Sequence, residues 1–219
     1  MRWWSAKLLR ILNISAVLEG SAPEPGVAVM IAANHVSWLD IFLISSVRPT
    51  RFIAKGDIRD WPIAGWIADK AGTLFIRREQ WRDTARINAR VHAALAEGDC
   101  VGLFPEGLTT EGDRILKFHS SLFASAVANR AFVHPVGIRY EYPDGTLCRE
   151  VSIRGDRTFM ESLGLVIGTR AVRARLVFAP PIETEGFTRR AVATQAQARV
   201  ASLLGLETPG REPGRGAGR

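Results

Sequence analysis

Residues 27–40 read VAVMIAANHVSWLD, and this stretch decides the fold. Its first half, residues 27–33, is a short and continuous apolar run, which is typical of a strand buried on both faces. A polar turn follows, and a helical pattern then runs from about Ser37 to Ser46. A buried strand that turns directly into a helix is the repeating unit of an α/β sheet. In such sheets ligands bind at the carboxyl ends of the strands, so this turn is a candidate functional site.

Outward from this unit, strands and helices alternate along the chain. Further strands are expected at short apolar runs, namely residues 51–54, 73–76, 101–104, 131–136, 150–153 and 171–178. Helices are expected at residues 61–67, 80–96 and 120–129, between the last two strands, and at 188–204. The alternation predicts an α/β fold with a mainly parallel or mixed sheet flanked by helices. A length of 219 residues suits one such domain.

The chain is expected to divide into three segments. Residues 1–20 are predicted to form an amphipathic helix that contacts a membrane, and residues 21–205 the folded domain. Residues 206–219 are rich in Pro, Gly and Arg, which predicts a disordered tail.

The N-terminal segment has the composition of an interfacial helix. On a helical projection one side carries Trp4, Leu8, Ile11 and Leu12, and the other carries Arg2, Arg10 and Asn13. Tryptophan and basic residues suit the headgroup zone of a bilayer. The alternative is a first helix packed on the domain. Residues 61–67 are a second candidate for membrane contact, with a buried helix as the alternative, and no run approaches the ~20 apolar residues of a membrane span.

The charge balance points to an anionic partner. The formal net charge is +7, which favours an anionic membrane surface or a nucleic acid. The chain has no helix-turn-helix, zinc-finger or RNA-binding signature, so no specific nucleic-acid partner is expected. Cys100 and Cys148 stand alone without CxxC spacing, which disfavours a zinc cluster and a disulfide framework.

His35 and Asp40 carry the candidate chemistry of the first turn. On one straight helix, five steps of ~100° place two side chains about 140° apart. The pair therefore meets only if His35 precedes the helix and folds back toward it. A neutral imidazole is suited to take a proton from an alcohol, and a carboxylate on its other nitrogen fixes the tautomer. The alternative is a structural histidine, with Asp40 paired to a backbone amide or an arginine.

Ser37 lies between these two residues, so a nucleophilic triad is conceivable. Ser37 stands where the helix begins, however, and a role as helix N-cap is simpler. The chain also has no Gly-x-Ser-x-Gly elbow.

Phe104-Pro105-Glu106-Gly107 forms a second motif at the end of an apolar strand. Pro105 removes a backbone donor and ends the ladder, and Gly107 permits an unusual backbone angle. Alone, the motif is an ordinary turn. Together with the His35 turn, it indicates the second wall of a cleft.

Four blocks in order resemble the glycerolipid acyltransferase family, which includes the lysophosphatidic acid (1-acylglycerol-3-phosphate) acyltransferases. They are Asn34-His35-x-x-x-x-Asp40, Gly72-Thr73-Leu74-Phe75-Ile76-Arg77-Arg78, Phe104-Pro105-Glu106-Gly107 and Val133-His134-Pro135-Val136. The resemblance extends from about residue 27 to residue 182, and four ordered blocks are a far stronger signal than any one of them.

The resemblance implies a role for His35 as general base and for Asp40 as its orienting partner. It implies direct transfer of an acyl group from acyl-CoA or acyl-carrier protein to the hydroxyl of a lysolipid, with lysophosphatidic acid as the family default. The substrate-binding residues that it implies are Asn34, Lys55, Arg77, Arg78, Glu106, Gly107, Thr109 and Pro135. In this set Arg78 and Glu106 would line the acceptor-headgroup site, and Pro135 would close its far side.

The resemblance also implies a glycerol-3-phosphate acyltransferase-like fold for residues 21–205, the acyltransferase domain. It implies no metal and no organic cofactor. The expected partners are membrane lipids and the acyl donor, and the expected location is peripheral (monotopic), at the cytoplasmic face of a membrane.

The sequence departs from the family at the phosphate-binding arginine of the Phe-Pro-Glu-Gly block. Thr109 occupies that place, and His119 replaces a lysine further on. The loss of an arginine from a bidentate phosphate site is a large change. Either other cations serve (Lys55, Arg77, Arg78, Arg114 or Lys117), or the acceptor carries no phosphomonoester. Residues 104–118 resemble the lyso-ornithine lipid acyltransferase branch, whose acceptor is a lipid amino acid.

Two alternatives from other functional classes remain at this stage. A hydrolase would use the same cleft to release acyl groups to water. A lipid carrier would need no base at His35.

Overall fold

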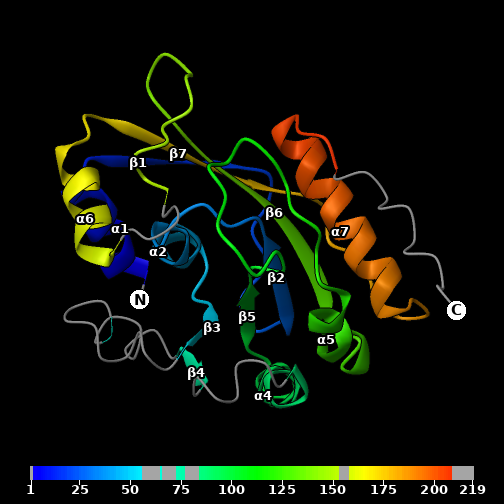
Figure 1. The fold of residues 1–219 in the computed structure, drawn as a ribbon. Coiled ribbons are helices and arrows are strands. Elements are labelled where there is room, and N and C mark those ends of the chain that lie inside the picture. Colours follow the sequence, from blue (N-terminus) through cyan, green and yellow to red (C-terminus); the bar gives the residue numbers. More distant parts are fainter. Residues whose placement is uncertain (1, 56–64, 66–72, 77–83, 153–157, 209–219) are drawn as a thin grey trace, which may run out of the picture.

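A seven-stranded mixed sheet forms the centre of the computed structural model, which describes residues 2–55, 65, 73–76, 84–152 and 158–208 (Figure 1). The strand order is β1-β7-β6-β2-β5-β3-β4. The strands are β1 (Ile14–Glu19), β2 (Val29–Ala33), β3 (Arg51–Lys55), β4 (Leu74–Ile76), β5 (Cys100–Leu103), β6 (Phe132–Glu141) and β7 (Val172–Phe178). β6 pairs with β7 in antiparallel fashion, and the other neighbours pair in parallel, which confirms the predicted α/β class.

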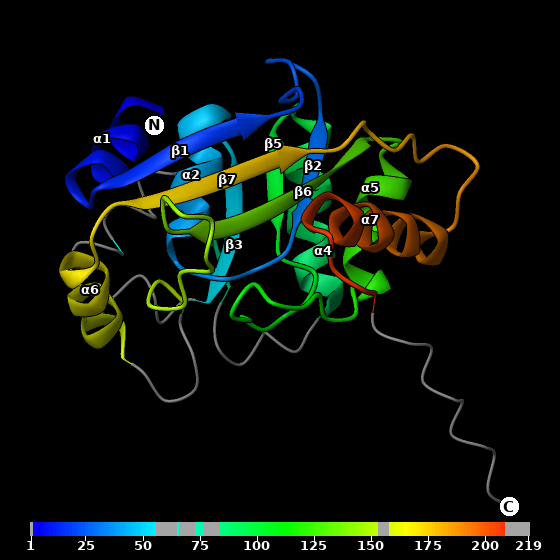
Figure 2. The ribbon, with the colours of Figure 1, turned by 90° about the horizontal axis from the view of Figure 1, so that it is seen from above.

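Helices cover both faces of the sheet (Figures 1 and 2). One face packs against α1 (Arg2–Ile11), α2 (Leu39–Val47) and α6 (Phe159–Gly168). The other packs against α4 (Thr84–Ala96), α5 (Ala124–Ala128), which follows a 3₁₀ turn at Ser120–Phe123, and α7 (Arg189–Leu204).

The continuous apolar run of β2 is explained by its central place between these two layers. Val29 and Ile31 contribute to one core, and Met30 and Ala32 contribute to the other. All of them are fully buried. A strand that is covered on both faces has no polar positions to alternate with, as the sequence predicts.

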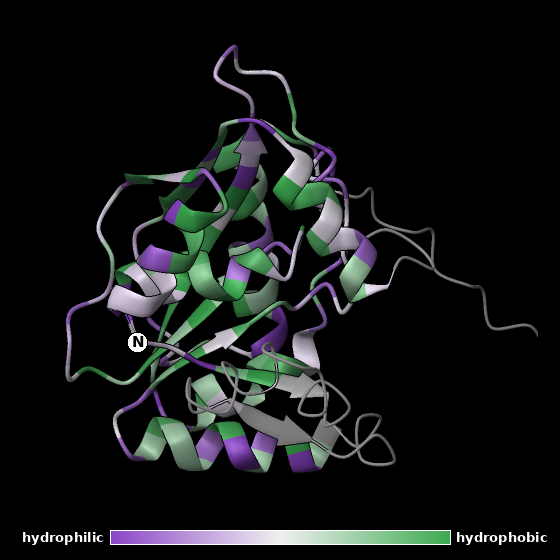
Figure 3. Ribbon diagram, turned by 90° about the vertical axis from the view of Figure 1, so that its left-hand side faces the viewer, coloured by the Kyte–Doolittle hydropathy of each residue, from purple (hydrophilic) through white to green (hydrophobic). Residues whose placement is uncertain are grey.

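Helix α4 has the two-sided character that is expected of a surface helix. Along α4, which runs across the bottom of Figure 3, hydrophilic and hydrophobic residues alternate in helical register. Ile87, Val91 and Leu95 of this helix are buried in the core. The predicted helix at residues 80–96 is thus confirmed from Thr84 onward, and its first residues lie outside the described part of the chain.

The N-terminal segment differs from the prediction of one helix over residues 1–20. α1 ends at Ile11, Asn13 takes a left-handed conformation with φ 56°, and the chain continues as β1 at the edge of the sheet. Asparagine tolerates this conformation and commonly ends helices. Leu9 and Leu12 are buried, so the segment packs on the domain through these two residues, whereas Trp4 and Ile11 of the predicted apolar side stay exposed.

Two later segments also differ from the strands that the sequence predicts. β6 continues to Glu141, past the predicted end at Val136, because Ile138 and Tyr140 also face the core. Residues 150–152 form a turn and bend and no strand, and residue 153 lies outside the described residues. Apart from residue 65, the predicted helix at 61–67 lies outside them as well, as does most of the predicted tail. In the described part of the chain, no helix has the length and apolarity to cross a membrane.

Candidate functional site

The two motif turns meet because their strands are parallel neighbours. β2 pairs with β5, with Ala32 beside Leu103, so both strands end at the same edge of the sheet. The His35 turn follows β2 there, and the Phe104–Gly107 turn follows β5. This is the sheet edge at which the sequence predicts a ligand site.

Asn34 fastens the end of β2 to β6. Its side-chain carbonyl accepts the backbone N–H of Ile138 at 2.7 Å, and its amide donates to the Ile138 carbonyl at 2.9 Å. The side chain is fully buried and imitates a backbone partner after the strand has ended. Asn34 therefore positions the turn from inside the protein, which differs from the implied contact with substrate.

His35 and Asp40 form a close polar pair at the centre of the site. His35 Nδ1 lies 2.7 Å from Asp40 Oδ2. The helix begins only at Leu39, so His35 precedes it and folds back, as the spacing requires. Asp40 Oδ2 also accepts the backbone N–H groups of Val36 at 2.8 Å and Ser37 at 3.0 Å. These bonds hold a fully buried carboxylate against the imidazole.

Aromatic stacking fixes the plane of the His35 ring. The imidazole stacks on Phe104 with ring centroids 4.0 Å apart, and Phe104 stacks on Phe52 at 5.6 Å. Gly102 makes room for this stack, since a Cβ there would lie 2.4 Å from the Phe52 ring. The His35 side chain is 22% exposed, and its Nε2 has no hydrogen-bond partner among the described residues. The open nitrogen is thus available to a bound molecule.

Glu106 acts as a clamp between two loops. Its Oε2 accepts the backbone N–H of His35 at 3.0 Å, and its Oε1 accepts that of Leu116 at 2.8 Å. The residue is buried, so both oxygens serve the protein itself, which differs from the implied contact with the acceptor headgroup. Gly107 follows with φ 72°, a conformation that glycine adopts without strain.

Burial raises the pKa of Glu106 to about 7. The two backbone N–H donors and the nearby His35 oppose this effect, because they favour the charged form. The clamp therefore changes its protonation state near neutral pH.

The structure removes support from Ser37 as a nucleophile. The residue is fully buried, and its Oγ accepts the backbone N–H of Leu39 at 3.4 Å. Its backbone N–H donates to Asp40. Ser37 thus helps to shape the turn before α2, but the N-cap position belongs to Trp38, so the predicted role of Ser37 as N-cap is wrong.

The other implied substrate-binding residues lie in different surroundings. Lys55 ends β3 at the same sheet edge as the two turns, whereas Arg77 and Arg78 lie outside the described residues. Thr109 precedes Thr110, whose N–H donates to the His35 carbonyl at 2.8 Å, so this loop borders the site. Pro135 is buried within β6 and pairs with Ala32 of β2, the strand that leads into the His35 turn.

Tyr140 is the site residue that sequence reasoning missed. Its hydroxyl donates to Asp40 Oδ1 at 2.8 Å from β6, and the side chain is almost fully buried. The only sequence signal is its place two residues after Ile138 on the inward face of a strand, which is also the signal of an ordinary core residue.

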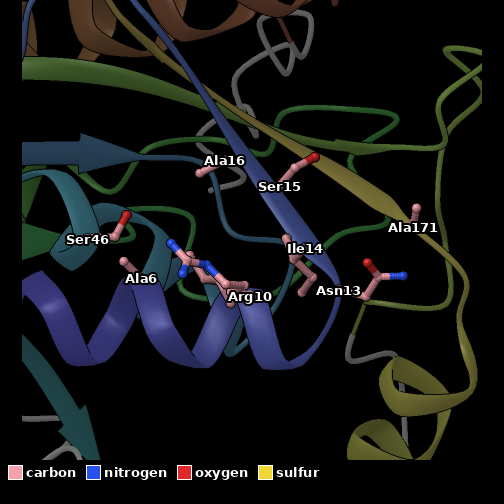
Figure 4. A pocket seen from close by; sticks show the side chains of 9 residues that line it. Ala6, Arg10, Asn13, Ile14, Ser15, Ala16, Ser46 and Ala171 are labelled. Carbon is pink, nitrogen blue, oxygen red and sulfur yellow. The ribbon is translucent and has the colours of Figure 1, made fainter.

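A separate cavity of about 400 Å³ lies between α1, the start of β1 and the end of α2 (Figure 4). Small side chains line most of it, and Arg10 is its one charged residue. Neither His35 nor Asp40 lines it. Within the described residues, no group of His, Cys, Asp and Glu side chains is arranged to hold a metal ion.

Comparison with known proteins identifies the family. The Acyltransferase family model matches residues 17–139, more than half of the chain. The chain belongs to the Acyltransferase family. As a member of this family it is an acyltransferase. The matched segment contains His35, Asp40 and Glu106, and it ends at Arg139, one residue before Tyr140.

Two relatives that are similar to this chain in sequence are also acyltransferases. The lyso-ornithine lipid O-acyltransferase of Pseudomonas aeruginosa is 38% identical over 209 residues, which are 95% of this chain and 80% of that protein. The 1-acyl-sn-glycerol-3-phosphate acyltransferase of Neisseria meningitidis is 44% identical over 133 residues, which are 61% of this chain and 52% of that protein.

A solved structure agrees with the fold. The crystal structure of the 1-acyl-sn-glycerophosphate acyltransferase PlsC from Thermotoga maritima aligns with a TM-score of 0.65. The alignment covers 92% of this chain and 77% of that chain at 21% identity, so it shows the shared fold alone.

Replacement of Glu106 by Gln tests the clamp. The Gln side chain offers one acceptor oxygen, and its NH₂ group faces the second backbone N–H, so we expect a loss of ~1–3 kcal/mol in the free energy of unfolding. In the wild type, Glu106 keeps its proton in the native state up to about pH 7 but releases it near pH 4.5 when unfolded. This group therefore makes the wild type less stable as the pH rises from about 4.5 to 7.

Urea denaturation at a series of pH values measures both effects. The Gln variant lacks this titration, so the stability difference between variant and wild type should narrow as the pH rises. Glu185→Gln, on the exposed Arg130–Glu185 pair, is the matched control and should leave the pH dependence unchanged. Equal pH dependence of all three proteins would contradict the assignment.

Proposed function

We propose that this acyltransferase transfers a fatty acyl group from a thioester of CoA or acyl-carrier protein to the free hydroxyl of a lysolipid, with His35 as the general base. The observation that carries the proposal is the His35–Asp40 pair at 2.7 Å with Nε2 left open at the sheet edge. A base needs one nitrogen oriented and the other free, and this geometry provides both.

The proposed reaction proceeds without an acyl-enzyme. His35 Nε2 takes the hydroxyl proton while the acceptor oxygen attacks the thioester carbonyl, and the Asp40 carboxylate stabilises the imidazolium that forms. The C–S bond then breaks, and the leaving thiolate receives the proton back from Nε2. The buried Ser37 supports this direct route, because it offers no accessible nucleophile beside the base.

For the acceptor, we propose a lyso-ornithine lipid ahead of lysophosphatidic acid. The similarity to the Pseudomonas aeruginosa enzyme covers 95% of the chain, and Thr109 replaces the phosphate-binding arginine of the family. Lysophosphatidic acid is kept as the second candidate because of the 44% identity to the Neisseria meningitidis enzyme.

A panel of lysolipid acceptors with purified enzyme tests both the role of His35 as the base and the identity of the acceptor. We expect labelled acyl groups to pass from acyl-CoA or acyl-carrier protein to lyso-ornithine lipid, and His35→Ala to lower this rate at least ~10²-fold, the scale of positioned proton transfer. His92→Ala, an exposed histidine on α4 that contacts Asn129, is the matched control and should retain wild-type activity.

The panel separates the alternatives as well. Acylation of lysophosphatidic acid alone would overturn the acceptor assignment. Thioester cleavage that is independent of any acceptor would indicate a hydrolase. Full activity of His35→Ala would overturn the proposed base.

We propose further that the enzyme binds the cytoplasmic face of a membrane as a peripheral protein. A lysolipid chain gains about 0.8 kcal/mol per CH₂ outside water, so the acceptor stays in the bilayer and the enzyme must reach it there. Thioester donors are cytoplasmic molecules, which favours that face. Trp3, Trp4 and Ile11 of α1 are exposed, with the Lys7 ammonium 4.8 Å from the Trp3 ring centroid.

The outer face of α6 supplies a second apolar contact. Met160 and Ile167 are 64% and 65% exposed, and Leu165 is exposed beside them. Glu161 is the one charged residue of the helix. Its side chain accepts the backbone N–H of Thr158 in the capping box at the start of the helix. An apolar outer face is unusual for a helix in water and suits a bilayer interface.

The position of α6 links this surface to the site. Trp38, three residues after His35, donates to Ser162 Oγ at 3.2 Å and packs against Phe159. α1 packs on α2, which begins next to Trp38. Figures 1 and 2 place α1 and α6 at the same end of the molecule, so one membrane surface can touch both helices.

Point substitutions test this surface, because a longer N-terminal deletion would reach β1. We expect Trp3→Ala/Trp4→Ala and Met160→Ser/Ile167→Ser each to lower co-sedimentation with phosphatidylglycerol-containing vesicles by several-fold. Phe187→Ser, an exposed aromatic residue on the loop before α7, is the control and should bind as the wild type does. Unchanged binding of both double variants would contradict the proposed surface.

A further inference from the structure

Tyr140 joins the catalytic pair from the far side of Asp40. The Tyr140 hydroxyl donates to Asp40 Oδ1 at 2.8 Å. The other carboxylate oxygen, Oδ2, is hydrogen-bonded to His35 Nδ1 and to two backbone N–H groups. Among the described residues, Tyr140 is the only partner of Oδ1. The tyrosine lies on β6, 100 residues from Asp40, so the sheet itself delivers this donor.

The surroundings make Tyr140 a donor only. Burial raises the pKa of its hydroxyl well above the ordinary value, and the Asp40 charge adds to this effect. Among the described residues, two titratable groups face the Tyr140–Asp40–His35 chain. They are Cys148, whose backbone N–H also donates to the Tyr140 carbonyl, and Glu106, which accepts the His35 N–H. The phenol therefore keeps its proton over the working pH range.

We propose that Tyr140 is a positioning residue for acyl transfer, and that it acts on His35 through Asp40. This inference rests on the proposed role of His35 as the base. The hydroxyl holds the carboxylate plane so that Oδ2 points at Nδ1. It also takes up part of the negative charge, which limits how strongly Asp40 favours the protonated imidazole.

Removal of the hydroxyl has two consequences. The carboxylate loses its only Oδ1 donor and is less firmly oriented, so proton transfer slows. The charge on Asp40 is less shared, so the protonated form of the base persists to higher pH. A purely structural tyrosine would change stability without moving the pH dependence of the reaction.

Tyr140→Phe tests the inference, because phenylalanine keeps the ring that fills the core. We expect kcat to fall about tenfold, the effect of losing ~1.4 kcal/mol from one hydrogen bond to a charged group, with the KM for the acceptor nearly unchanged. The acidic limb of the kcat/KM profile should move to higher pH. Tyr142→Phe is the matched control, since its hydroxyl lies near Cys148 and Glu150 instead of Asp40.

A second variant should move the acidic limb of the kcat/KM profile in the opposite direction, and it keeps both the ring and the hydroxyl of Tyr140. The chain has 2 tyrosines, so fluorotyrosine incorporated into Tyr142→Phe labels Tyr140 alone. A fluorinated phenol is a stronger donor, and we expect the acidic limb to move to lower pH.

The possible results separate this inference from the proposed function. An unchanged acidic limb in both Tyr140 proteins, with an active wild type, would overturn the role of Tyr140. A wild type without acyl transfer would instead overturn the proposed function.

Discussion

The buried carboxylate of Asp40 is the constraint on which the site depends. A charged carboxylate away from water is stable only when hydrogen bonds compensate its lost hydration. Here four donors do so, and they come from the His35 ring, the turn before α2 and the middle of the sheet. Their geometry requires the chain to leave β2 and curl around the carboxylate before the helix begins. The same requirement orients the imidazole.

A second buried acidic residue, Glu106, extends this order to the rim of the site. Glu106 joins the His35 backbone to the loop that contains Leu116, and Thr110 of that loop returns a hydrogen bond to the His35 carbonyl. The Phe104 ring stacks on the His35 imidazole, and Phe52 stacks on Phe104 behind it, so one face of the imidazole is covered. The backbone N–H, the carbonyl, Nδ1 and one ring face of His35 thus each have a neighbour that constrains them. Such preorganisation is what proton transfer at a fixed position needs.

The sequence predicted the features that are local or periodic. The apolar run of β2, the turn with its His35–Asp40 spacing and the strand that ends just before Phe104 all follow from patterns of a few residues. The edge strand β1 was missed, because Ile14–Glu19 continues the apolar character of α1 and only Asn13 marks the break. Edge strands with one half-buried face give weak signals.

The partners of the site residues were not predictable, because they are distant in sequence. Tyr140 and Ile138 reach Asp40 and Asn34 only through the pairing of β6 with β2, across about a hundred residues. Glu106 is polar and follows a strand, which indicated a ligand contact. Its burial and its two backbone donors, which make it a clamp, appear only in three dimensions.

The protonation pattern of the His35 ring tests the central claim most directly. Nitrogen-15 NMR of histidine-labelled enzyme at a pH where the ring is neutral distinguishes the two tautomers, and His35→Ala assigns the signal. If Asp40 holds the imidazole as described, Nδ1 carries the proton and Nε2 shows the shift of an unprotonated nitrogen. A proton on Nε2 would mean that the nitrogen facing the site cannot act as a base, which would contradict the proposed role of His35.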